Sequence, residues 1–184
     1  PEKLAVAAQL VAKHNYELAM EVYAQVLLQD PQSAEALTNV GICYAALGIM
    51  AKGHGAMVQA ITLEPRVAKY HRNLGELLRR LGRFQEAEAS LRTALDLSPN
   101  DPRTWSILGL TLAQQGRTAE GLHTYRAWAA LGYPFPGTHV KMGTALAEQN
   151  LFAEARACYE AALAIDAAFE PASRALRALP ASAP

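Results

Sequence analysis

The side chains that most often catalyse reactions or bind metals are few in this chain of 184 residues, and they are widely spaced. The five histidines show no His-x-x-x-His spacing, and none stands beside a cysteine in a ligand pattern. Cys43 and Cys158 lie far apart in the sequence, and there is no glycine-rich phosphate loop. These patterns argue against enzymatic activity, and we expect no metal and no cofactor.

Two other groups of polar residues have a spacing that suits binding. Asn39 and Asn73 are 34 residues apart. An amide side chain both donates and accepts hydrogen bonds, so it can hold a peptide backbone without reading its side chains. Four basic residues share one predicted helix, with Glu76 as the only acid on their face: Lys69, Arg72, Arg79 and Arg80. They predict a locally positive surface that attracts carboxylates.

The composition excludes several classes of partner. Basic and acidic residues number 17 each, so the chain has no global field for nucleic acid or an anionic membrane. No apolar run approaches the ~18 residues of a membrane-spanning helix, and no signal peptide is visible. Two cysteines do not suggest a disulfide framework. We expect a cytoplasmic protein, with a removed leader or a periplasmic location left open, and the alanine-rich composition suggests a bacterial source.

The elements that position these residues repeat with a period of 34. Three independent markers share this step: Gly41, Gly75, Gly109 and Gly143; Pro31, Pro65 and Pro99; and Gly48, Gly82 and Gly116, followed by Asn150. Internal self-similarity at such a period is the signature of stacked helical repeats. Each unit buries too little surface to stand alone, and stacked units share one continuous core.

Within each unit the apolar residues step by three and four, which predicts two amphipathic helices. The core face of the first helix is expected at Leu37, Val40 and Tyr44; His71, Leu74 and Leu78; Trp105, Leu108 and Leu112; and His139, Met142 and Leu146. The second helix is expected to bury Ala19, Tyr23 and Val26; Gly53, Met57 and Ala60; Ala87, Leu91 and Ala94; Gly121, Tyr125 and Trp128; and Ala155, Tyr159 and Ala162. A glycine or asparagine in the left-handed conformation ends each first helix.

Stretches such as "TWSILGLTLAQQGR" from Thr104 and "FQEAEASLRTALDLSPN" from Phe84 resemble the tetratricopeptide repeat family. The resemblance implies an all-α, right-handed superhelical solenoid of antiparallel helix pairs. Five repeats are expected in a single domain: residues 1–33, 34–67, 68–101, 102–135 and 136–169. A capping helix at 170–179 and a disordered tail at 180–184 would follow.

Two repeats depart from the pattern. Gly53 and Gly55 lie inside the second helix of the second repeat, and we favour close packing there over a soft joint. In the fourth repeat Trp128 stands where the family usually has alanine, and Tyr133 replaces the closing proline. We favour a locally altered core over an aromatic loop at 133–135 that contacts a partner.

The resemblance also implies that the first helix of each repeat lines a concave groove that binds protein segments. The predicted binding residues are Asn39, Lys69, Arg72, Asn73, Glu76, Arg79, Arg80, Arg103, Ser106 and Lys141, with Thr38 and Leu110 among other residues of the same lining. The asparagine ladder is similar to that of protein glycosyltransferases, although Ile107 and Lys141 take its next two places. The basic cluster resembles the carboxylate clamp of co-chaperones, but Leu4 and Ala8 replace the clamp's lysine and asparagine.

We therefore predict a non-enzymatic scaffold that binds an extended or acidic segment of a protein partner. Three alternatives stay open at this point: the recognition domain of a larger enzyme such as a protein glycosyltransferase, a secretion-type chaperone, and a self-assembling scaffold that forms homo-oligomers.

Overall fold

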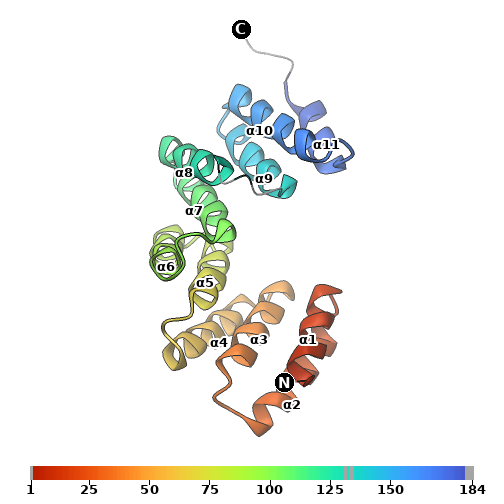
Figure 1. Ribbon diagram of the computed structural model, residues 1–184, viewed down its shortest axis with the longest axis vertical. Coiled ribbons are helices and arrows are strands. Elements are labelled where there is room, and N and C mark those ends of the chain that lie inside the picture. Colours follow the sequence, from red (N-terminus) through yellow and green to blue (C-terminus); the bar gives the residue numbers. More distant parts are fainter. Residues whose placement is uncertain (1, 131, 133–134, 181–184) are drawn as a thin grey trace. The chain divides into compact units, whose positions relative to one another are not determined.

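The computed structural model describes residues 2–130, 132 and 135–180, and these residues form eleven helices and no strand (Figure 1). The first six helices are α1 (Glu2–Ala12), α2 (Tyr16–Gln29), α3 (Ala34–Ala46), α4 (Met50–Leu63), α5 (Ala68–Arg80) and α6 (Phe84–Leu97). The others are α7 (Pro102–Gln114), α8 (Thr118–Ala130), α9 (Pro136–Ala147), α10 (Phe152–Ile165) and α11 (Glu170–Ala178). None of these helices is both long enough and apolar enough to cross a membrane.

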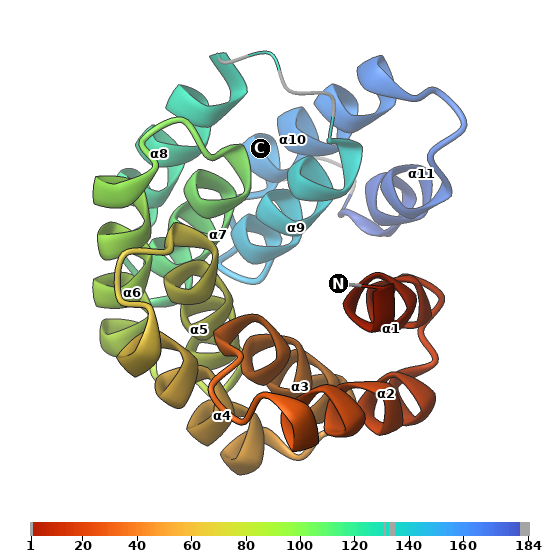
Figure 2. The same cartoon turned by 60° about the horizontal axis from the view of Figure 1, so that its bottom comes forward.

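The chain divides into two compact units, Pro1–Asn100 and Asp101–Pro184. In the first unit α1 packs on α2, α3 on α4, and α5 on α6. In the second unit α7 packs on α8 and α9 on α10, while α11 packs on both α9 and α10 (Figure 2). The predicted all-α solenoid of helix pairs is confirmed. A single domain over residues 1–179 stays a prediction, and the predicted tail lies outside the described residues except for Pro180.

Close contact inside the four pairs from α3–α4 to α9–α10 depends on glycine. A Cβ atom placed on Gly75 would lie 2.6 Å from Leu91 Cγ, and one on Gly143 would lie 2.5 Å from Tyr159 Cε1. A Cβ on Gly53 would lie 2.9 Å from the carbonyl oxygen of Gly41, so close packing at Gly53 is confirmed. Gly55 differs, because a Cβ there would meet no atom within 4 Å.

The left-handed residues that end the first helices are also confirmed. Gly48, Gly82 and Gly116 have φ values of 79°, 73° and 80°, and Asn150 has a φ of 62°. His14 takes the same place in the first repeat with a φ of 61°, which we did not predict. The signal was present in the sequence, because counting back one period from Gly48 reaches this histidine. A non-glycine residue in this region is uncommon, although histidine is among the residues that adopt it more often.

The predicted core positions are buried or half-buried in both units. Ala87, Leu91 and Ala94 of α6 are completely buried. Trp128 is 1% exposed, which confirms the altered core in the fourth repeat. Tyr133 and Pro134 of the adjoining turn lie outside the described residues, so the alternative of an aromatic loop is untested there.

Candidate protein-binding surface

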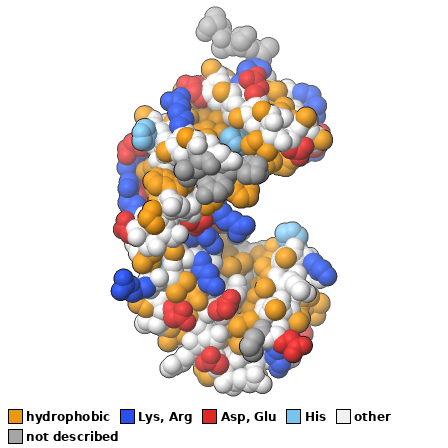
Figure 3. All heavy atoms as spheres, viewed as in Figure 1, with side chains coloured by type: hydrophobic (Ala, Val, Ile, Leu, Met, Phe, Trp, Pro, Cys, Tyr) orange, Lys and Arg blue, Asp and Glu red, His pale blue; other side chains and the backbone are white. Residues whose placement is uncertain are grey.

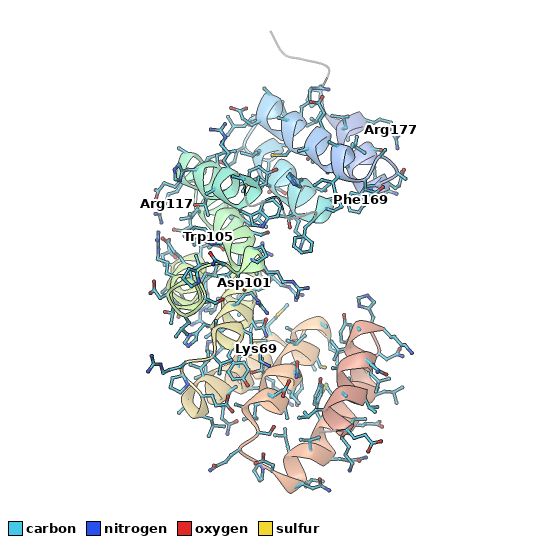
Figure 4. All side chains as sticks on the ribbon, viewed as in Figure 1. Lys69, Asp101, Trp105, Arg117, Phe169 and Arg177 are labelled. Carbon is cyan, nitrogen blue, oxygen red and sulfur yellow. The ribbon has the colours of Figure 1, made fainter. Side chains whose placement is uncertain are left out.

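Seven of the predicted binding residues lie on α3 and α5, which contact each other as the first helices of successive repeats. Residues three or four apart share one side of a helix. The partly accessible stripe of α3 and α5, which we call the α3/α5 face, consists of Glu35, Asn39, Ile42, Lys69, Arg72, Asn73, Glu76, Arg79 and Arg80. Two contacts join the helices. Lys69 Nζ lies 3.4 Å from Glu35 Oε1, and Arg80 Nη2 donates to the carbonyl oxygen of Ala45 at 3.2 Å. Lys69 is labelled in Figure 4.

Asn39 and Asn73 occupy equivalent places in the middle of this face. Both are half-buried, and within the described residues neither amide has a hydrogen-bond partner in the protein. Neither is sealed from solvent, because neither is among the fully buried polar atoms that lack a partner. The two amides therefore have free donors and acceptors on neighbouring helices.

Unlike the two asparagines, basic side chains of the face are already paired with other groups of the protein. Arg79 forms a bidentate pair with Glu76, with Nε–Oε2 and Nη2–Oε1 distances of 2.8 and 2.9 Å, and its side chain is only 15% exposed. Lys69 pairs with Glu35, while roughly half of each side chain stays exposed. Figure 3 shows basic and acidic side chains next to one another over this region. The positive surface predicted from the sequence is therefore partly neutralised.

The pairing of Lys69 with Glu35 was missed by sequence reasoning. The two residues are separated by one repeat period, so the repeat itself carried the signal. A residue and its equivalent one repeat later lie on neighbouring first helices, and opposite charges at such places can meet.

The other three predicted residues belong to the second unit. Ser106 is 8% exposed, and its hydroxyl donates to Thr138 Oγ1 at 3.3 Å, so little of its side chain is open to a partner and its role in binding stays a prediction. Arg103 on α7 and Lys141 on α9 are exposed, and α7 and α9 contact each other. The further lining residues Thr38 and Leu110 are buried at 2% and 5%, because both sides of the first helices pack against neighbours.

Both cysteines are buried within apolar clusters. Burial raises the pKa of the Cys43 thiol to about 11, and burial likewise raises the pKa of Cys158. A thiol must lose its proton to act as a nucleophile, so neither cysteine is activated. Within the described residues no group of three or more His, Cys, Asp or Glu side chains could hold a metal ion.

His139 is part of a buried aromatic cluster in the second unit. Its Nδ1 shares a hydrogen bond with the Tyr125 hydroxyl, and its ring lies 5.1 Å from that of Trp128. Burial lowers the pKa of His139, and it raises the pKa of Tyr125 far above the usual range. The cluster is a packed core that holds a neutral histidine.

Comparisons with solved structures support the fold. TTC0263, described as a thermophilic TPR protein in Thermus thermophilus, matches with 20% identity over 96% of each chain and a TM-score of 0.82. YrrB, described as a TPR protein with an unusual peptide-binding site, matches with 20% identity, 95% and 90% coverage and a TM-score of 0.67. A Thermobaculum terrenum O-GlcNAc transferase mutant matches with 28% identity and a TM-score of 0.60, over 61% of this chain and 22% of the transferase chain.

No curated protein matches the sequence. Two family models described as tetratricopeptide repeat do match, one at residues 7–53, 51–102 and 72–134 and the other at 137–169. These ranges cover most of the chain and together extend from α1 to α10. The chain therefore belongs to the tetratricopeptide repeat family.

Proposed function

We propose that the protein is a non-enzymatic interaction scaffold that binds an extended segment of a partner protein across the α3/α5 face. The observation that carries this proposal is the pair of uncommitted amides at Asn39 and Asn73. Neighbouring helices lie about 8–10 Å apart, and an extended chain advances about 3.3 Å per residue. The two amides are therefore spaced to hold backbone groups about three residues apart on one bound segment.

Charge adds a preference for acidic segments. The face carries four basic and two acidic residues. The Lys69–Glu35 pair is half-exposed, and such pairs contribute only about 0.2–1 kcal/mol. A carboxylate of the partner can therefore replace Glu35 at little cost. The Arg79–Glu76 pair is bidentate and less exposed, so we assign Arg79 to the structure of α5 and not to the partner.

Two of the similar solved structures support a binding role. The solved structure of YrrB is described as having a peptide-binding site, which supports the proposal that this fold presents one here. The match to part of an O-GlcNAc transferase supports a second candidate, in which the chain is the recognition domain of a larger enzyme. The sequence of the full-length gene product tests that candidate directly, because a catalytic domain would adjoin the repeats.

The binding proposal is tested with peptides selected by display on the wild-type chain and then titrated against variants. Asn39→Ala and Asn73→Ala should each weaken binding by about 0.5–1.5 kcal/mol, with little dependence on salt. Asn100→Ala, in an exposed turn, is the matched control and should leave binding unchanged. Selected peptides that bind all three variants equally would move the binding site away from this face.

The charge preference has its own test. Lys69→Glu should slow association with acidic peptides, and more so at low salt, because screening weakens exposed charges. The double variant Glu35→Lys/Lys69→Glu restores the net charge of the face and should recover most of the association rate. An association rate that is the same in all three proteins would contradict the role of charge.

A further inference from the structure

The second unit contains a pocket of about 250 Å³ between α8 and α10, with α9 at its base. Leu122 and Ala129 line it from α8, and Ala157 and Ala161 line it from α10. This pocket lies on the second helices of two repeats, whereas the α3/α5 face lies on first helices. Small-molecule sites usually measure ~300–1,000 Å³, so the pocket suits a single anchoring side chain better than a larger ligand.

The repeat register explains why the pocket exists. At the place of Ala129 the other four repeats have a large aliphatic residue: Leu27, Ile61, Leu95 and Leu163. At the preceding place the pattern is reversed, because Trp128 stands where the others have Val26, Ala60, Ala94 and Ala162. The indole of Trp128 fills the core against His139. The neighbouring alanine leaves empty the space that a leucine or isoleucine takes in the other repeats.

The first unit presents the kind of side chain that this pocket lacks. Leu28 near the end of α2 is 84% exposed, the highest value among the exposed large hydrophobic residues of the described chain. Its equivalents in the other repeats are polar or small: Thr62, Asp96, Ala130 and Ala164. The apolar surface of a leucine exposed to this extent is removed from water only if another molecule covers it.

Charged side chains lie beside both surfaces. α2 carries Glu17 and Glu21 and no basic residue. Glu21 is on the same side of the helix as Leu28, two turns away, or about 10 Å along the axis. At the pocket Arg126 of α8 is exposed, and within the described residues it has no ion-pair partner. Glu154 of α10, which is half-buried, also lines the pocket. An acidic helix that inserts a leucine therefore meets one basic and one acidic side chain at the pocket, so burial of the leucine and not net charge carries the contact.

We propose that two copies of this chain associate by inserting Leu28 of one copy into the pocket beside Ala129 of the other. The two surfaces are different, so the contact is head-to-tail and repeats from copy to copy until a ring closes or a filament grows. Full burial of a leucine corresponds to roughly a ten- to hundredfold change in an equilibrium constant. The association is therefore expected to depend strongly on these two residues.

The test is sedimentation velocity of the full chain over a concentration series. The wild-type protein should form larger species as concentration rises. Leu28→Asp and Ala129→Leu should each weaken association about tenfold or more, the first by removing the anchor and the second by filling the pocket. Val58→Asp on the exposed side of α4 and Ala127→Leu on the exposed side of α8 are the matched controls, and both should associate like the wild type. Circular dichroism should show unchanged helicity in all four variants.

Mixing the two weakened variants distinguishes this contact from any other. Leu28→Asp keeps an open pocket, and Ala129→Leu keeps the leucine anchor, so one intact contact can form between them. The mixture should give a one-to-one complex of two chains that does not grow further. A wild-type chain that stays single at every concentration, association that survives both substitutions, or a mixture that forms no complex would each overturn the proposal. These outcomes are independent of peptide binding at the α3/α5 face, since Asn39 and Asn73 are unchanged throughout.

Discussion

Replacing glycine by alanine should have opposite effects at two places in the first unit, Gly55 and Gly75. Both glycines lie inside helices, where alanine stabilises by about 1 kcal/mol relative to glycine. A Cβ on Gly55 meets no atom within 4 Å, so Gly55→Ala should raise the free energy of unfolding by this full amount. A Cβ on Gly75 would lie 2.6 Å from Leu91 Cγ and 2.8 Å from Leu91 Cδ2.

The magnitude at Gly75 follows from the available space. Carbon atoms in favourable contact are about 3.5–4.0 Å apart, so Leu91 must retreat by about 1 Å. Leu91 is completely buried between Ala87 and Ala94, which are also completely buried, so it has no free space to enter. Overpacking of this kind costs about 1–3 kcal/mol. Gly75→Ala should therefore be destabilising by up to about 2 kcal/mol after the helix gain.

Urea denaturation followed by circular dichroism at 222 nm measures both changes in the full chain. A second background sharpens the test, since Leu91→Ala removes the side chain that the new methyl group would strike. In that background Gly75→Ala should become stabilising by up to about 1 kcal/mol, since the new methyl group would still lie 3.3 Å from the carbonyl oxygen of Ala87. If Gly75→Ala stabilises the wild-type chain as much as Gly55→Ala does, close packing of α5 on α6 is not what selects glycine there.

Three further predictions concern buried side chains. Burial lowers the pKa of His139 in the folded chain, whereas in the unfolded chain the pKa of a histidine is about 6.5. The unfolded chain therefore binds a proton more readily, and the free energy of unfolding should fall as pH falls from 7 to 5. His139→Gln should flatten this pH dependence in thermal melts, whereas His123→Gln on the exposed side of α8 should not. Trp128→Ala should cost about 3–5 kcal/mol in urea denaturation, since the indole is 1% exposed and fills the space between α8 and α9. Cys43 and Cys158 should react with a thiol reagent only as fast as the chain opens, and unreduced mass spectrometry should find two free thiols; fast labelling of the folded chain would contradict their burial.

Much of the fold follows from the sequence because the repeat is local. The period of 34 residues predicts which two helices pack together. The packing glycines, such as Gly75, predict where those two helices approach each other. The left-handed positions that end the first helices follow from the same register, which extends to His14. Residues within one repeat are close in the chain, so their contacts need no knowledge of distant elements.

Only the tertiary structure decided which polar groups are free to bind. The count of basic residues on α5 suggested an open positive surface, but Glu76 holds Arg79 and Glu35 holds Lys69. Asn39 and Asn73 keep free amides because no neighbouring side chain reaches them within the described residues.

Burial in the second unit was also decided by three-dimensional packing. Ser106 is buried because α9 covers it and supplies Thr138 as a hydrogen-bond partner. The pocket beside Ala129 exists because Trp128 fills the core and leaves its small neighbour facing an open space. Sequence periodicity gives the side of a helix on which a residue lies. The rotation and separation of neighbouring helices then decide whether that side chain is covered, paired or left free.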